Sequence, residues 1–343
     1  MINRIFRFTI VLAGIAGLSA GVVSQTPSTA SPARVEGGRG VNSQARVQVT
    51  VLRMPYVEER NVAELSPGPD ALVSGGLLVE LERAGALATS PDAVRLTPKQ
   101  DRQYGAWQRL ALANGNLADA VAGTVRDGRL AVGLLANCSS LLGMLGGVQH
   151  AGATGRADKV GLVYIDAHGD FNTPETTLSG MLGGMDVAAA AGLCLTRLRV
   201  TSKLDPPLPP ADMILAGVRD TDPLEQELID QHKVPRLSVA DLRARAGALR
   251  TTFAALSARV ARIYVHIDMD VLDPAEVPGH SLSVRGGPTS AELGEAVVEM
   301  FKDPKVVAIG IASTPTGERD ANGRSRKAAY TLIRAAIRGA QAR

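Results

Sequence analysis

The sequence predicts an α/β fold in which a parallel sheet carries helices on both faces. Two observations lead to this prediction. Apolar runs of strand length recur along the chain, and segments with the 3.6-residue spacing of an amphipathic helix separate them. The runs are apolar throughout rather than alternating, which is typical of parallel strands buried on both faces. Because no repeat or second linker interrupts the pattern, one domain is expected over residues 46–343.

The expected strands and helices alternate along the chain. In sheets of this kind ligands bind beyond the carboxyl ends of the strands, so the residues that follow each strand are the candidate site. The expected strands are 47–54, 129–136, 160–166, 211–218, 262–270 and 305–313. The expected helices are Asp70–Gly85, Lys99–Arg126, Leu224–Gln231, Val239–Ala246, Ser290–Lys302 and about Ser325–Ala342.

Composition argues against nucleic acid as a partner. The chain of 343 residues carries 37 Lys and Arg against 34 Asp and Glu, a formal charge of only +3. The basic residues do not cluster with aromatic ones, as they do in nucleic-acid-binding faces. Nucleic acid is therefore not an expected partner.

The N-terminus has the composition of an export signal. Residues 1–25 place two arginines before an apolar run rich in small residues, with small residues at 18–20 or 22–24 for cleavage. The alternative is an uncleaved anchor, because the run nearly reaches spanning length. Residues 26–45, rich in Pro, Ser, Thr and Gly, predict a flexible linker. The mature protein is expected to be periplasmic or secreted and free of the membrane.

Two expected strands end in acidic residues at every second position. Side chains at i, i+2 and i+4 of an extended strand point the same way. The rows are Asp166, His168 and Asp170 after the third strand, and His266, Asp268 and Asp270 at the end of the fifth.

If these two strands are neighbours, four carboxylates and at least one imidazole face one small volume. Four bare carboxylates would repel one another strongly, and two divalent cations would neutralise them. Either row alone could equally be a polar loop, but both rows in one α/β chain favour a metal site. Carboxylate with imidazole suits Mn, and also Zn, Fe, Co or Ni.

The motifs "DAHGDFNTPE" and "HIDMDVLDPAEVPG" resemble those of the ureohydrolase family, which includes arginase, agmatinase and formiminoglutamase. "SPGPDAL", "AGVRDTDPLE" and "RGG" support the resemblance, which covers about residues 47–340. It implies a three-layer α/β/α fold with a mainly parallel sheet, a binuclear manganese centre, and hydrolysis of a guanidino group to urea and an amine. It also implies a homo-oligomer, a trimer or hexamer.

The resemblance implies a ligand for each metal position. Asp166 and Asp268 would bridge the two ions, His168 and Asp270 would complete one, and Asp170 would bind the other. The sixth family ligand is a histidine in Gly-Gly-Asp-His-Ser, where this chain has Cys138.

A cysteine at this position has chemical consequences. A thiolate adds negative charge and a softer donor, which lets Zn or Fe compete better with Mn. Some relatives that hydrolyse N-hydroxyarginine also use cysteine here. Two alternatives remain: Cys138 is a small buried residue, or it forms a disulfide with Cys194, the other cysteine of the chain.

The resemblance also implies how substrate is held. Asn172 and Ser179 match positions that bind the carboxylate of an amino-acid substrate, and Asp222 matches the one that binds its α-ammonium. Loop capping is the alternative for each. Gly183 replaces a proton-shuttling histidine, and His280 is the candidate substitute, although a surface histidine is the more ordinary interpretation.

The largest departure lies near the last strand. Ala312 stands where the family has a glutamate that grips the guanidinium, so a charge-assisted pair is lost. Glu318 or Glu175 could replace it.

The favoured function is an exported metal hydrolase in which a metal-bridging hydroxide attacks the trigonal carbon of a guanidine-like substrate. Asp170 would orient the hydroxide and relay its proton. Arginine and N-hydroxyarginine are the first candidate substrates. The alternatives are a hydrolase of a formimidoyl or other linear amidine or amide, and a non-catalytic metal-binding member of the family.

Overall fold

An eight-stranded sheet runs through the described residues, and all of its strands are parallel. The computed structural model describes residues 46–57, 60–152, 156–244 and 247–343. The expected signal peptide and linker lie outside these residues. The sheet order is β2-β1-β3-β8-β7-β4-β5-β6, so the expected α/β fold with a parallel sheet is confirmed. The strands are β1 Val47–Met54, β2 Ala86–Thr89, β3 Leu130–Leu135, β4 Val160–Ile165, β5 Met213–Ala216, β6 Arg236–Leu237, β7 Arg262–Asp268 and β8 Val306–Ala312.

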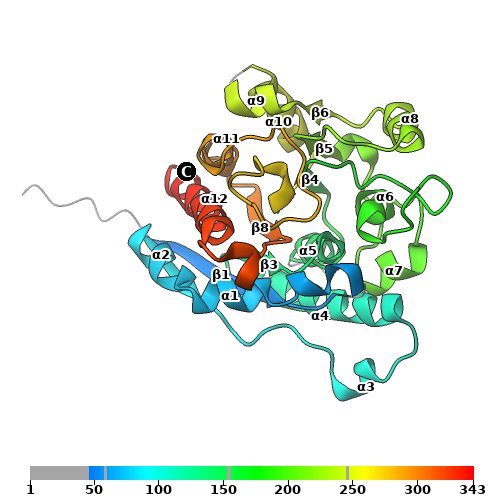
Figure 1. The fold of residues 1–343 in the computed structure, drawn as a ribbon, viewed down its shortest axis with the longest axis horizontal. Helices are drawn as coiled ribbons and strands as arrows, with labels where there is room; N and C mark the ends of the chain where they lie inside the picture. The colour runs from blue at the N-terminus through cyan, green and yellow to red at the C-terminus, as the bar shows by residue number, and fades with distance from the viewer. Residues whose placement is uncertain (1–45, 58–59, 153–155, 245–246) are drawn as a thin grey trace, which may run out of the picture. The chain divides into compact units, whose positions relative to one another are not determined.

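Helices cover both faces of the sheet, as Figure 1 shows. One apolar core joins the sheet to α1, α2 and α9–α12, and a second joins it to α4–α8. These two cores make the three α/β/α layers. The helices are α1 Gly68–Ser74, α2 Leu77–Arg83, α3 Pro98–Asp101, α4 Ala106–Arg126, α5 Leu141–Gln149, α6 Asp186–Ala190, α7 Thr196–Thr201, α8 Pro223–Gln231, α9 Val239–Ala244, α10 Ala248–Arg259, α11 Ser290–Phe301 and α12 Arg324–Gln341. None of the helices in the described residues is long and apolar enough to span a lipid bilayer.

Some elements differ from those expected. The expected helix 70–85 is two helices, α1 and α2, because the chain turns at Gly76, whose φ is +103°. The expected helix 99–126 is α3 and α4, which begin on either side of an exposed stretch ending at Gly105. The short edge strands β2 and β6 were not expected, nor was α5, which is buried on every side and therefore has no amphipathic pattern.

The register of the sheet positions the site. β4 pairs with β7 so that Ile165 lies opposite Ile267, and the next residues are Asp166 and Asp268. β7 pairs with β8 so that Asp268 lies opposite Ala312. The carboxyl ends of these central strands therefore meet at one edge of the sheet, where parallel sheets bind ligands.

Glycines allow α5 to pack closely against α4. A Cβ at Gly147 would lie 2.5 Å from the Cβ of Val121 and 2.6 Å from the carbonyl oxygen of Ala118. A Cβ at Gly123, on α4, would meet nothing within 4 Å.

This difference gives a matched pair of variants. We expect Gly147→Ala to lower the free energy of unfolding by about 1–3 kcal/mol, because the helices must separate. Gly123→Ala should raise it by up to about 1 kcal/mol, because alanine favours the helix and nothing obstructs it. Denaturant unfolding measures both, and equal effects of the two substitutions would contradict the packing argument.

Candidate metal centre

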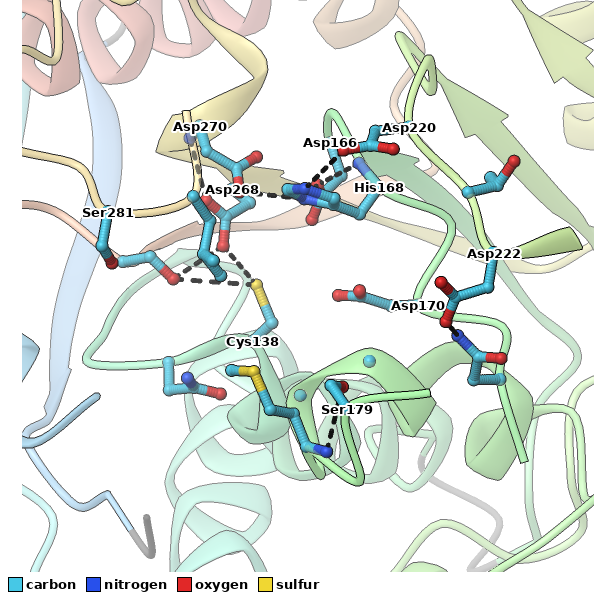
Figure 2. A pocket seen from close by; sticks show the side chains of 18 of the residues that line it. Cys138, Asp166, His168, Asp170, Ser179, Asp220, Asp222, Asp268, Asp270 and Ser281 are labelled. Atoms are coloured by element: carbon cyan, nitrogen blue, oxygen red, sulfur yellow. Dashed lines mark hydrogen bonds and ion pairs between the residues drawn. The ribbon is translucent and has the colours of Figure 1, made fainter. Parts of the chain in front are cut away.

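The loops that follow five strands, β3, β4, β5, β7 and β8, line a cavity with a buried group of metal-binding atoms, part of which Figure 2 shows. Three sets of possible ligands occur, and within each set the ligand atoms lie within 4.8 Å of one another. The sets are Cys138 with Asp166 and Asp268, then Asp166 with His168 and Asp270, and then Asp268 with Asp270 and His280.

Asp268 lies at the centre of these contacts. Ser313 Oγ donates to its Oδ2 at 2.6 Å, the Cys138 sulfur lies 2.6 Å from the same oxygen, and the Asp270 amide donates to Oδ1 at 2.9 Å. Asp268 ends β7, and Ser313 directly follows β8, its neighbour in the sheet. Cys138 begins the turn after β3, where the Asn137 side chain caps the amide of Ser139. Three strand ends therefore converge on one carboxylate.

His168 joins the two acidic rows. Its Nδ1 lies 3.3 Å from Asp166 Oδ1 and 3.1 Å from Asp270 Oδ2. The His168 amide also donates to Asp166 Oδ1 at 2.7 Å, so the carboxylate is held by the backbone. A parallel bridge to Asp220 fixes the strand end that carries His168.

Asp170 faces the same space without belonging to one of the three sets. Figure 2 shows its carboxyl group pointing toward Cys138 and Asp268. The Tyr164 hydroxyl donates to Asp170 Oδ2, and the backbone of Asp170 takes a positive φ of 45°. Tyr164 was not expected at the site, although it precedes Asp166 by two residues and so points to the same face of β4. Ser313 was also not expected.

His266 does not face the site as its row predicted. It is fully buried one step below the cavity, and its Nε2 lies 3.3 Å from the Cys138 sulfur. The alternation of side chains along a strand predicts on which side of the sheet a residue lies, but not how far it lies from the cavity. His266 lies two residues before the end of β7 and packs against Tyr164 and Tyr264 beside the Cys138 sulfur, and it does not line the cavity.

His280 is buried, which contradicts the interpretation as a surface histidine. Its side chain is only 2% exposed, and its Nε2 lies 3.5 Å from Asp268 Oδ1 without a hydrogen-bond partner. The Leu282 amide donates to its other ring nitrogen at 3.3 Å. The imidazole therefore presents an unpaired nitrogen to the acidic group.

The expected substrate-binding residues line the same cavity of about 260 Å³. Asn172 Nδ2 donates to Asp222 Oδ2 at 3.1 Å, and Ser179 is exposed nearby. Gly183 also lines the cavity and leaves it open where a side chain would reach in.

Two alternatives from the sequence are wrong. Glu175 and Glu318 are exposed and do not line the cavity, so neither replaces the missing glutamate in the described structure. Cys138 and Cys194 are both free thiols, so they do not form a disulfide.

Comparison with known proteins identifies the family. The family model described as "Arginase family" matches residues 47–338. The chain is 31% identical over 267 residues to an arginase from Bacillus caldovelox, covering 76% of this chain and 87% of that protein. The chain belongs to the arginase family. The expectation of an arginase-like hydrolase is thereby confirmed.

Two further members of the arginase family are informative. An N(omega)-hydroxy-L-arginine amidinohydrolase from Streptomyces lavendulae is 36% identical over 152 residues, which cover 44% of this chain and 50% of that protein. The crystal structure of an arginase from Bacillus cereus superposes with a TM-score of 0.74 at 23% identity, covering 84% of this chain and 98% of that one. This second likeness shows the fold alone, and it agrees with the three layers described above.

The charges of the site fit the divalent cations that the arginase family implies. Burial, together with the charge of Asp166, raises the pKa of Asp170, Asp268 and Asp270 above the usual aspartate range. Burial opposes ionisation of Asp166, but hydrogen bonds with His168 outweigh it and lower the pKa of Asp166.

The surroundings shift the pKa values of His168 and His280 in opposite directions. Burial lowers the pKa of His168, but its bonds to Asp166 and Asp270 outweigh this and raise the pKa to about 12. Burial also lowers the pKa of His280, and neighbouring Asp268 only partly offsets it. Two divalent cations among these carboxylate, imidazole and thiol ligands would reverse the cost of ionising the carboxylates.

The metal-stripped protein should lose stability as the pH rises from about 5 to about 8. Asp170, Asp268 and Asp270 have raised folded pKa values, so above their unfolded value of 3.8 the folded state binds more protons and is destabilised as they ionise. His168 acts in the same direction, because its contribution is complete below 6.5 and is lost toward 12. The lowered pKa of Asp166 adds no slope above 3.8. Burial lowers the pKa of His266 and His280, so these two oppose the slope below 6.5 and add none above it, and the three aspartates outnumber them.

Thermal unfolding of chelator-treated protein across this pH range measures the slope. Added Mn²⁺ should reverse it, because cation binding needs the ionised carboxylates. The double variant Asp170→Asn/Asp270→Asn should show a shallower slope, and an unchanged slope would mean that these groups do not cause it.

Proposed function

We propose that this member of the arginase family hydrolyses a C–N bond of a guanidine-like group on an amino-acid-shaped substrate. The observation that carries the proposal is one cavity with two kinds of lining. Buried carboxylates, a thiol and imidazoles lie at one end, and the partly exposed Asp222 lies across the cavity from Asp268 (Figure 2). The end with the buried carboxylates suits the reacting group of the substrate, and the end with Asp222 suits the charged amino-acid part of the substrate.

Two divalent cations, with Mn²⁺ first and Zn²⁺ or Fe²⁺ as alternatives, would be held by six side chains. When bound, the cations supply the charge that lowers the pKa of a coordinated water and polarises the carbon under attack. The Cys138 sulfur is a softer donor than imidazole and favours Zn²⁺ or Fe²⁺ over Mn²⁺. The ligands are Cys138, Asp166, His168, Asp170, Asp268 and Asp270.

Two residues are positioned to move protons. Asp170 is held by the Tyr164 hydroxyl, and its carboxyl group faces the cavity, where it can take a proton from the attacking water and pass it on. His280 is kept neutral by burial and presents an unpaired nitrogen beside Asp268. It takes the place of the histidine that Gly183 replaces, and passes a proton to the leaving amine.

The amino-acid end of the substrate meets three polar residues. Asp222 supplies a carboxylate for the α-ammonium, and it is already oriented by Asn172 and by the Leu178 amide at 3.4 Å. Asn172 and Ser179 supply neutral groups for the carboxylate. The pairing of opposite charge with Asp222 fixes the direction of the substrate in the cavity.

Ala312 favours a substrate less basic than arginine. It lies opposite Asp268 in the β7–β8 pair, so its side chain points to the same face and offers no carboxylate. A guanidinium there lacks the charge-assisted pair, whereas an N-hydroxyguanidine is less basic and needs it less. N-hydroxyarginine, hydrolysed to hydroxyurea and an amine, is the preferred candidate. The absent carboxylate also favours a second candidate, a formimidoyl or other linear amidine.

Substituting Ala312 tests this preference. We expect the wild type to release hydroxyurea from N-hydroxyarginine with at least about tenfold higher kcat/KM than urea from arginine, because the guanidinium is unpaired. Ala312→Glu should narrow or invert the ratio, and Ala312→Gln, of similar size without charge, should not.

Controls separate the proposal from its alternatives. Asp268→Ala should abolish metal-dependent turnover of every substrate. Turnover of formimidoyl compounds with none of either guanidine would favour the second candidate. Turnover that survives Asp268→Ala would contradict the proposed centre.

Replacing the sulfur tests the metal preference. We expect Cys138→His to shift metal content toward Mn²⁺ when Mn²⁺ and Zn²⁺ are supplied together, because imidazole is a harder donor than thiolate. Metal analysis of the purified variants measures this. Cys194→Ser, which removes the other free thiol, is the matched control. Unchanged metal content in Cys138→His would mean that the sulfur is not a ligand.

A further inference from the structure

His266 lies directly beneath the sulfur of Cys138. It is fully buried, and its two ring nitrogens have two different partners. Nε2 lies 3.3 Å from the Cys138 sulfur, and Nδ1 lies 2.8 Å from the Tyr264 hydroxyl. The ring is also held in plane, because it stacks on Tyr164 with centroids 5.0 Å apart and 12° between the planes. These contacts fix the orientation of the buried imidazole toward the sulfur.

Tyr264 sets which nitrogen carries the proton. Within the described part of the chain, the Tyr264 hydroxyl makes its hydrogen bond to His266. A buried hydroxyl with one acceptor nearby donates to it, since an unused donor is costly. The lone pair of His266 is then on Nδ1, and the N–H is on Nε2, which faces the sulfur.

Gly310 on β8 makes room for this arrangement. It pairs with His266 in the sheet, and a Cβ at Gly310 would lie 2.1 Å from the Tyr264 hydroxyl oxygen. The absence of a side chain at this strand position therefore leaves the hydroxyl where it reaches the imidazole.

We propose that Tyr264 and His266 form a buried relay that donates a hydrogen bond to the Cys138 sulfur and so positions and tunes it as a metal ligand. This inference rests on the proposed function, in which Cys138 binds a cation. His266 is a positioning residue, because it reaches the reacting group only through the sulfur. A donor to a ligand atom fixes its orientation and withdraws charge from it, which changes how strongly it binds the metal.

The neighbouring tyrosine provides a comparison within the same layer. Tyr164 donates to Asp170, and Tyr264 acts through His266 on Cys138. Removing either hydroxyl therefore weakens a different ligand of the proposed centre, and only one of the two changes should alter the sulfur.

Cobalt-substituted protein tests the relay, because thiolate bound to Co²⁺ gives a charge-transfer absorption that carboxylate and imidazole do not. The wild type should show this band, and Cys138→Ser should lose it. His266→Leu should move the band to lower energy and weaken Co²⁺ retention against a chelator by about 10- to 100-fold. His266→Gln, whose amide can donate to the sulfur, should keep the band close to that of the wild type.

Two conservative variants keep the test decisive if His266→Leu does not fold. Tyr264→Phe should move the band, whereas Tyr164→Phe should weaken Co²⁺ retention and leave the band in place. A band at the wild-type energy in Tyr264→Phe would overturn the relay. Absence of the band in wild-type protein would instead remove Cys138 as a ligand, and a normal band without hydrolysis of any substrate would refute only the proposed function.

Discussion

The repulsion between Asp166 and Asp268 is the constraint on which the rest of this structure depends. The β4–β7 register sets the two carboxylates side by side at the end of a buried sheet, and Asp270 and Asp170 add two more. Folding alone does not favour this, because burial raises the cost of each charge. The surrounding donors each offset part of that cost: Ser313 bonds Asp268, and backbone amides bond the carboxylates that face them. The divalent cations that the arginase family implies would offset the rest of this cost.

Much of the fold can be predicted from the sequence because the strands of a buried parallel sheet must be apolar along their whole length. Runs such as 160–166 and 262–270 are apolar throughout, and every second residue at their ends is polar. That combination fixes both burial and direction. The elements that were not predicted lack such a signal: α5 is buried on all sides, and β6 has two residues. Their structure is set by tertiary packing rather than by local pattern.

The candidate site was predicted less evenly, and the two histidines explain why. His266 belongs to a periodic strand, so its face follows from the sequence, but its distance from the cavity depends on packing with Tyr164 and Tyr264. His280 lies in a loop whose course depends on contacts with Asp268 and Leu282 that are distant or irregular. The strand pattern therefore predicted, wrongly, that His266 lines the cavity, and it gave no information on the position of His280. Ser313 was missed for the same reason, since a single polar residue after β8 carries no repeat.

The departures at positions 138, 183 and 312 are best understood together. Ala312 removes a negative charge from the cavity, and Cys138 supplies one when it binds metal, so the total charge near the cations need not change. A thiolate ligand would thus move negative charge from the substrate side to the ligand side, where it would lower the Lewis acidity of the centre. A weaker Lewis acid suits a more reactive, less basic carbon–nitrogen group than guanidinium. Gly183 lines the cavity without a side chain, and the buried His280 imidazole enters it from another loop, so a group absent at one position has a chemically similar group at another.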